Sequence, residues 1–206
     1  MEKVVITIAR QYGSGGRTIG QMLAEKLHIH YYDKELLKLA SDESGIHEGL
    51  FAGVDEKLKN SPLARISKKV YQGQLIAPGH GDFTSDENLF NYQAKVIKEL
   101  AEEESCVIIG RCADYVLNDY DNVLSVFVHA PESYCIEQAK KKLSMSEKDL
   151  RKFIQKTDKE RAEYYKHYTG REWTDARNYD LCLDSSKLGF QRCVEEIEAY
   201  MKVRFS

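Results

Sequence analysis

A short run of glycines and polar residues near the start of the chain has the residue types of a phosphate-binding loop. The run consists of Gly13, Ser14, Gly15, Gly16, Arg17 and Thr18. Glycines allow successive backbone N–H groups to turn toward one anion, and the positive end of a following helix adds to their field. We therefore expect these residues to bind nucleotide phosphates. Arg17 would supply a fixed positive charge for catalysis, and Thr18 would be a ligand of a nucleotide-bound Mg²⁺ ion.

The segments on either side of this loop support that interpretation. Val4–Ala9 predicts a buried strand and Thr18–Leu27 predicts a helix, so the loop joins strand to helix. The usual pattern G-x-x-x-x-G-K-[ST] is only partly met, because Gln11 replaces its first glycine and Arg17 its lysine. Arginine is a planar fork and lysine a compact ammonium, so the exchange preserves phosphate binding but changes the geometry available for transfer. A glycine-rich turn that binds no ligand is the alternative.

Arg111 and Asp114 follow a second apolar stretch, Cys106–Ile109. Ligands of open parallel sheets bind where several loops meet at the carboxyl ends of the strands. We therefore expect both side chains to contact a substrate, with Arg111 holding a phosphate. The alternative is an ordinary ion pair between them on the surface.

Asp33 lies at a comparable position, after the short stretch His30–Tyr32. There it would contact a phosphate acceptor or a metal-bound water. Equally, an aspartate in front of the helical pattern Lys34–Ala40 can accept hydrogen bonds from the first N–H groups of that helix. Both interpretations stay open on the sequence.

A group of basic residues near the C-terminal end of the chain could close over phosphates. It comprises Lys156, Lys159, Arg161, Lys166, Arg171 and Arg177. Charge accumulates on the transferred group during phosphoryl transfer, and cations that arrive on closure stabilise it. We select Arg161 as the catalytic member. The alternative is a solvated helix face, balanced by neighbouring carboxylates.

The pattern of elements predicts an α/β fold. Short apolar runs alternate with segments in which apolar residues recur every three or four positions. The predicted strands are Val4–Ala9, His30–Tyr32, Cys106–Ile109, Val123–Val128 and Leu181–Leu183. The predicted helices are Thr18–Leu27, Lys34–Ala40, Asn88–Glu103, Ala113–Leu117, Glu132–Leu143, Glu147–Tyr164 and Phe190–Val203. Ser146 and Asp149 form a plausible capping box for the helix that begins at Glu147.

Two polar stretches interrupt this alternation within what we expect to be a single domain, residues 1–206. We assign 41–87 as a substrate-binding lobe and 158–178, which includes the polar and aromatic stretch Lys166–Tyr179, as a lid. Four aromatic residues there could stack on a base or pack the lid against the domain: Tyr164, Tyr165, Tyr168 and Trp173.

Composition limits the function classes. A formal net charge of −3 gives no reason to expect nucleic-acid binding, and no apolar run approaches the ~20 residues of a membrane span. The five cysteines form no C-x-x-C pair, and the histidines show no zinc-ligand spacing. We therefore expect a cytoplasmic protein without a structural metal. Its oligomeric state is not predicted.

Taken together, the motifs resemble the cytidylate kinase-like family. The resemblance rests on Ile8–Gly20, Tyr31–Asp33, Ile109–Asp114, Phe127–Pro131, Arg161–Tyr165, Trp173 and Asn178–Gly189. It implies a P-loop NTPase fold of the nucleoside monophosphate kinase type, with a parallel five-stranded sheet, helices on both faces, an acceptor-binding lobe and a lid. It also implies ATP as phosphate donor, Mg²⁺ as metal, and a nucleoside monophosphate, nominally CMP or dCMP, as acceptor.

The resemblance further implies that the glycine loop holds ATP, that Arg111 and Asp114 contact the acceptor, and that Arg161 belongs to the lid. Two alternatives stay open. The chain could be a regulatory module that binds a nucleotide without turning it over, for which the Arg17 exchange is the main support. It could also be a P-loop kinase of a small molecule other than a nucleotide, which would differ only in the lobe 41–87.

Overall fold

The computed structural model describes residues 3–58 and 73–205 and has a parallel sheet at its centre. The sheet has five strands in the order β2-β3-β1-β4-β5. They are β1 (Val5–Arg10), β2 (His30–Tyr32), β3 (Cys106–Ile109), β4 (Val123–His129) and β5 (Leu181–Asp184). Every pairing is parallel, which confirms the fold class predicted from the sequence.

Strand β1 is central because both of its faces are apolar. All six of its residues are buried. Val5 and Ala9 pack into the core cluster on one face of the sheet, whereas Ile6 and Ile8 pack into the cluster on the other. This alternation follows from the two-residue period of a strand, and it explains why the sequence of β1 reads as a continuous apolar run.

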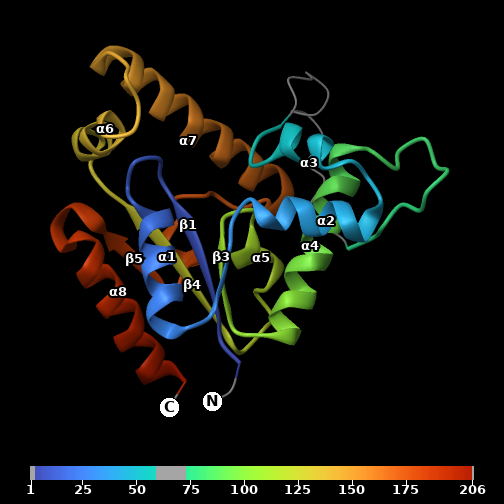
Figure 1. Cartoon of the computed structure of the whole chain (residues 1–206), viewed down its shortest axis with the longest axis horizontal. Helices are drawn as coiled ribbons and strands as arrows, with labels where there is room; N and C mark the ends of the chain where they lie inside the picture. Colours follow the sequence, from blue (N-terminus) through green and yellow to red (C-terminus); the bar gives the residue numbers. More distant parts are fainter. Residues whose placement is uncertain (1–2, 59–72, 206) are drawn as a thin grey trace.

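Helices cover both faces of the sheet (Figure 1). One face is covered by α1 (Gly16–Leu27) and α8 (Ser185–Arg204). The core cluster on the other face takes in residues of α2 (Glu35–Ser44), α3 (Glu48–Val54), α4 (Asp86–Glu103) and α5 (Ala113–Val116). Beyond the carboxyl ends of the strands lie α6 (Glu132–Lys140) and α7 (Glu147–Thr169), and the short 3₁₀ helix η1 (Ala176–Asn178) precedes β5.

Helices α7 and α8 differ most from their predicted bounds. Helix α7 continues to Thr169 instead of ending at Tyr164, because its last turns are buried by packing onto the core. Helix α8 begins at Ser185, before the predicted Phe190, and is interrupted at Gly189, whose φ is +72°. The N-cap half of the predicted capping box is confirmed, since the Ser146 hydroxyl accepts a hydrogen bond from the N–H of Asp149 at 3.2 Å. The Asp149 carboxylate accepts from the Ser146 hydroxyl at 2.6 Å.

The segment 41–87 contains α3, which the sequence did not predict, and its residues 59–72 lie outside the described part of the chain. Phe51 and Val54 of α3 are buried in the core cluster, so this helix packs against the domain. The assignment of 41–87 to acceptor binding stays a prediction. Within the residues that the structure describes, none of the helices is long and apolar enough to cross a membrane.

Candidate active site

The glycine loop connects β1 to α1 and is anchored from beneath by buried hydroxyl groups. Ser14 is fully buried, and its hydroxyl lies 2.9 Å from the carbonyl of Gln11 and 3.0 Å from that of Val128. The hydroxyl of Ser185, also buried, donates to the carbonyl of Ser14 at 2.6 Å. The Ser14 side chain therefore fixes the loop to β4 and faces away from any bound ligand, while the Ser14 carbonyl fixes the loop to α8.

Gly15 gives the loop its shape. Its φ is +85°, in the left-handed region that glycine adopts readily, and a Cβ atom at this position would overlap the ring of Phe190. Helix α1 starts at the next residue, and no side chain caps it. Among the described residues, none accepts a hydrogen bond from the N–H groups of Gly16, Arg17 or Thr18. These groups are left available for an anion.

An open pocket with an empty volume of about 780 Å³ lies over this loop. The loop residues Gly13, Gly15, Gly16, Arg17 and Thr18 line it, and so do residues from β1, α6, α7 and α8. The Thr18 hydroxyl is an oxygen ligand of the kind that Mg²⁺ prefers, so the residues present fit a magnesium–nucleotide complex. The pocket is therefore the candidate donor site.

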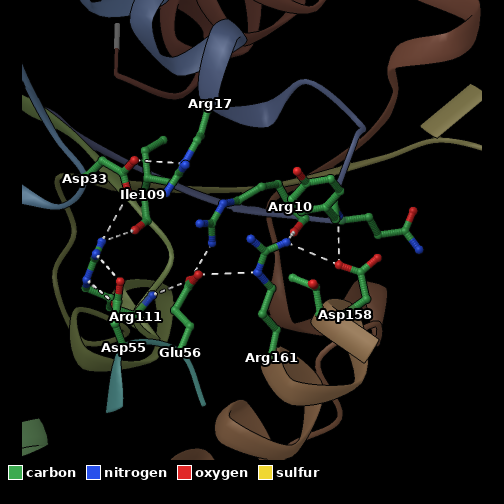
Figure 2. Close-up of polar contacts among 12 residues, drawn as sticks. Arg10, Arg17, Asp33, Asp55, Glu56, Ile109, Arg111, Asp158 and Arg161 are labelled. Carbon is green, nitrogen blue, oxygen red and sulfur yellow. Dashed lines mark hydrogen bonds and ion pairs between the residues drawn. The ribbon is translucent and has the colours of Figure 1, made fainter. Parts of the chain in front are cut away.

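Arg17 turns from the first turn of α1 toward the end of β2 (Figure 2). Its Nε lies 2.8 Å from Oδ2 of Asp33, and its side chain is 48% exposed. Asp33 does not cap the following helix, because its carboxylate pairs with guanidinium groups and no side chain caps α2. The capping alternative for Asp33 was therefore wrong.

Arg111 is a buried cation held by two carboxylates. Its side chain is 1% exposed, and its Nε and Nη2 each lie 3.0 Å from an oxygen of Asp55. Nη1 lies 3.4 Å from Oδ1 of Asp33 and donates to the carbonyl of Ile109 at 3.1 Å. An exposed Arg111–Asp114 pair, the alternative from the sequence, is therefore wrong.

Arg10 and Glu56 form the centre of the site, and sequence reasoning selected neither. Arg10 is the last residue of β1, its side chain is 4% exposed, and its Nη1 pairs with Oε1 of Glu56. Burial alone would raise the pKa of Glu56, but the guanidinium groups of Arg10 and Arg161 outweigh it and hold this pKa far below its usual value. Glu56 is therefore ionised. The position of Arg10 at a strand end was an available signal, whereas nothing in the sequence links Glu56 to it.

Arg161 reaches the same site from α7. Its Nε lies 3.3 Å from Oε2 of Glu56, and its Nη1 lies 3.2 Å from Oδ1 of Asp158. Asp158 also accepts a hydrogen bond from the N–H of Tyr12 at 2.8 Å, so it ties α7 to the glycine loop. Burial lowers the pKa of Arg161 and raises that of Asp158. We name the eight interacting side chains the arginine–carboxylate cluster: Arg10, Arg17, Arg111, Arg161, Asp33, Asp55, Glu56 and Asp158 (Figure 2).

A family model described as the cytidylate kinase-like family matches residues 5–187. This range includes every strand of the sheet, the glycine loop and all eight residues of the arginine–carboxylate cluster. The chain belongs to this family. Among curated proteins, the cytidylate kinase of Methanopyrus kandleri is 26% identical over 193 residues, which cover 89% of this chain and 86% of that protein.

Solved structures extend the comparison from the cytidylate kinase-like family to P-loop kinases. An uncharacterized protein from Eubacterium ventriosum has a TM-score of 0.72 and 25% identity, covering 97% of this chain and 99% of its own. Shikimate kinase from Bacteroides thetaiotaomicron has a TM-score of 0.55 at 15% identity, covering 97% and 98%. The second similarity concerns the fold alone, and it confirms the expected P-loop kinase architecture.

Six basic residues were expected to close over phosphates. Of these six, Arg161 alone belongs to the arginine–carboxylate cluster and lines the pocket over the loop. Lys156 and Lys159 are mostly exposed and face Glu160 and Glu163 one helical turn away. Arg177 pairs with Asp175 on the surface. For Lys156 and Lys159 the alternative of a solvated helix face is confirmed, whereas Arg177 lies outside α7, on η1. The remaining two also interact elsewhere, Lys166 with Glu172 and Arg171 with Tyr115.

The aromatic residues near the end of α7 pack against the core and do not form a base-stacking surface. Tyr164, Tyr165, Tyr168 and Trp173 are at most 6% exposed. Tyr168 stacks on Phe90 of α4, with ring centroids 4.0 Å apart. The packing alternative is therefore confirmed for these side chains, while the closing motion of 158–178 stays a prediction.

Asp114 is separated from the cluster and buried against one of these tyrosines. The hydroxyl of Tyr165 donates to its Oδ2 at 2.6 Å, yet burial dominates and raises the pKa of Asp114 to about 6. Contact of Asp114 with an acceptor stays a prediction. Asp114 makes no ion pair with the cluster among the described residues, but it lines a second, smaller pocket together with Glu56, Arg111 and Arg161.

The raised pKa of Asp114 predicts a loss of stability as the pH rises. The folded state binds this proton more tightly than the unfolded state, so stability falls between the unfolded pKa near 3.8 and the folded pKa of about 6. We expect Asp114→Asn to remove about 2 kcal/mol of the decline in unfolding free energy between roughly pH 4.5 and 7.5. Urea denaturation at both pH values measures it, with the exposed Asp119→Asn as control. An unchanged pH dependence would contradict the assignment.

Proposed function

We propose that this protein transfers the γ-phosphoryl group of ATP to a nucleoside monophosphate, with CMP or dCMP as the nominal acceptor. One observation carries the proposal: Arg10 and Arg161 line the same pocket as the glycine loop and also belong to the arginine–carboxylate cluster. These two guanidinium groups therefore lie between the candidate donor site and the edge of the sheet where Arg111 and Asp33 lie. Membership of the cytidylate kinase-like family supports a phosphotransferase.

In this proposal the protein acts mainly by positioning and charge. The N–H groups at the start of α1 hold the donor phosphates, and Arg161 stabilises the negative charge that develops on the transferred group. A bound Mg²⁺ ion, held by Thr18, would neutralise the donor oxygens. Phosphoryl transfer needs little covalent chemistry from the protein, so alignment of the two substrates provides most of the acceleration.

The test is a phosphotransferase assay of the purified chain with ATP, Mg²⁺ and a panel of CMP, dCMP, UMP, AMP and GMP. We expect product with at least one pyrimidine monophosphate, and we expect Arg161→Ala to lower kcat by about 100-fold. Lys159→Ala is the matched control, because Lys159 lies on the same helix, its side chain is 75% exposed, and it lies near Glu163 on the solvated face of that helix. Turnover by the unchanged chain no greater than by Arg17→Ala and Arg161→Ala would exclude these acceptors.

The orientation of Arg17 favours a second candidate, a module that binds a nucleotide without turning it over. The guanidinium pairs with Asp33 at the end of β2, whereas a P-loop lysine contacts the donor phosphates. Calorimetry separates the two candidates. Tight binding of ATP together with no acceptor-dependent release of ADP would favour the module, and acceptor-dependent release would exclude it.

A further inference from the structure

The carboxylate of Glu56 occupies a site with the properties of an oxyanion pocket. Three donors converge on it: Nη1 of Arg10, the backbone N–H of Arg111 at 3.2 Å, and Nε of Arg161 at 3.3 Å (Figure 2). They come from β1, from the turn after β3, and from α7. Guanidinium groups and a backbone N–H are the groups with which proteins bind phosphate.

The backbone around this pocket is shaped for a close approach. Gly110 has a φ of +68°, and a Cβ atom on it would overlap both the Glu56 carboxylate and the guanidinium of Arg10. Arg111 and Cys112 follow with φ of +55° and +56°, and Glu56 itself has a φ of +52°. Such left-handed conformations of non-glycine residues cluster at ligand sites and persist only when the surroundings enforce them. Here they direct the N–H of Arg111 at the carboxylate.

The pocket also offers more donors than the carboxylate uses. Within the described residues, the Nε atom of Arg10 is buried and has no hydrogen-bond partner. A carboxylate is planar and has two oxygens, whereas a phosphate monoester is tetrahedral, has three terminal oxygens and carries up to two negative charges. A phosphate therefore has the additional oxygen and the additional charge for this set of donors.

We propose that Glu56 is an internal substitute for the phosphate of the acceptor, which displaces it and binds to Arg10, Arg161 and the N–H of Arg111. This inference rests on the proposed function and names the group of the acceptor that the site recognises, a phosphate monoester dianion. Arg10 becomes a substrate-binding residue. Since Arg10 and Arg161 also line the pocket over the glycine loop, a phosphate bound here lies beside the donor.

The exchange also defines a selectivity. An entering dianion replaces a monoanion, so the cations of Arg10 and Arg161 gain an additional favourable charge interaction. An acceptor whose only anionic group is a carboxylate gains no charge in the exchange and must still displace Glu56. The site therefore favours phosphate monoesters over carboxylates.

The test compares Glu56→Gln with the unchanged chain in calorimetric titrations with inorganic phosphate. Saturating AMP-PNP and Mg²⁺ fill the glycine loop, so the titration reports the second site. Because the internal competitor is lost, we expect phosphate to bind about tenfold more tightly to the variant, and the acceptor KM to fall while the ATP KM stays within about twofold. Formate, a monoanion, should bind more weakly than phosphate to both. Glu132→Gln is the control and should change neither phosphate binding nor the KM values, because it removes a half-buried carboxylate of α6 that pairs with Arg151 of α7, outside the cluster.

Two further variants locate the effect. Glu56→Asp keeps the charge but shortens the side chain, so it should also tighten phosphate binding. It replaces Glu56→Gln in the test if that variant does not fold. Arg10→Met in the Glu56→Gln chain should abolish phosphate binding at this site. Unchanged or weaker phosphate binding by folded Glu56→Gln or Glu56→Asp would overturn the inference, as would full binding without Arg10. Tighter phosphate binding by a chain that phosphorylates no acceptor would support this site and reject only the proposed function.

Discussion

Replacing Arg111 by methionine should lower the unfolding free energy by about 3–5 kcal/mol, because the carboxylate of Asp55 would lose the cation with which it pairs and Asp33 would keep only the half-exposed Arg17. Arg111 is 1% exposed and pairs with both Asp33 and Asp55, and its Nη1 donates to the carbonyl of Ile109. Methionine is long enough to fill much of the volume, so the charge is the main loss. For a domain of this size the melting temperature should fall by roughly 6–20 °C, which differential scanning calorimetry measures.

The control for Arg111 is Arg151→Met, which removes an arginine of similar pairing from the surface. Arg151 pairs with Glu132, but its side chain is 47% exposed, so we expect a loss below about 1 kcal/mol. Adding Asp55→Asn to Arg111→Met should restore part of the stability, because it removes the carboxylate that lost its ion pair. If both single variants melt at the same temperature, Arg111 is not the electrostatic centre that its burial indicates.

The second large effect is expected at the glycine loop. Gly15→Val should reduce nucleotide affinity by at least about 1,000-fold, because the branched side chain disrupts several N–H contacts to phosphate at once. Gly15 has a φ of +85°, and the added Cβ atom would overlap the ring of Phe190. Titration of the variant with a fluorescent ATP analogue measures the loss.

Gly45→Val separates the loop effect from the general cost of a left-handed valine. Gly45 has a φ of +72°, caps the end of α2, and has nothing within 4 Å of an added Cβ atom. It should lose about 1–2 kcal/mol of stability and keep its nucleotide affinity. Retained nucleotide binding by a folded Gly15→Val chain would rule out the loop as the donor site.

Much of the fold was predictable because its signals are local. The apolar run of β1, the glycine loop and the Ser146 N-cap each depend on residues adjacent in the sequence, and the structure contains all three. The end of α7 was not predictable in the same way. Its last turns are helical because Tyr165 and Tyr168 pack on α4, α5 and the core, and that contact is a tertiary one.

The site was only partly predictable for a similar reason. Asp33 and Arg111 were expected at strand ends and Arg161 in a lid over the phosphates, and the structure brings all three side chains into the cluster. The central pair was not expected, because Arg10 and Glu56 are 46 positions apart and Glu56 lies in a segment that reads as a charged loop. Only the folded chain brings this carboxylate between three donors.

The balance of charges in the arginine–carboxylate cluster also affects the rate at which each proposed substrate associates with the protein. Its four arginines face four carboxylates, so little field extends beyond the cluster itself. On the donor side, Lys141 and Lys142 line the pocket over the loop, and no carboxylate among the described residues forms an ion pair with either. If the proposed function holds, long-range electrostatic steering should act on one substrate: rising ionic strength should slow the association of the nucleotide donor, whereas the association rate of the acceptor should depend little on salt.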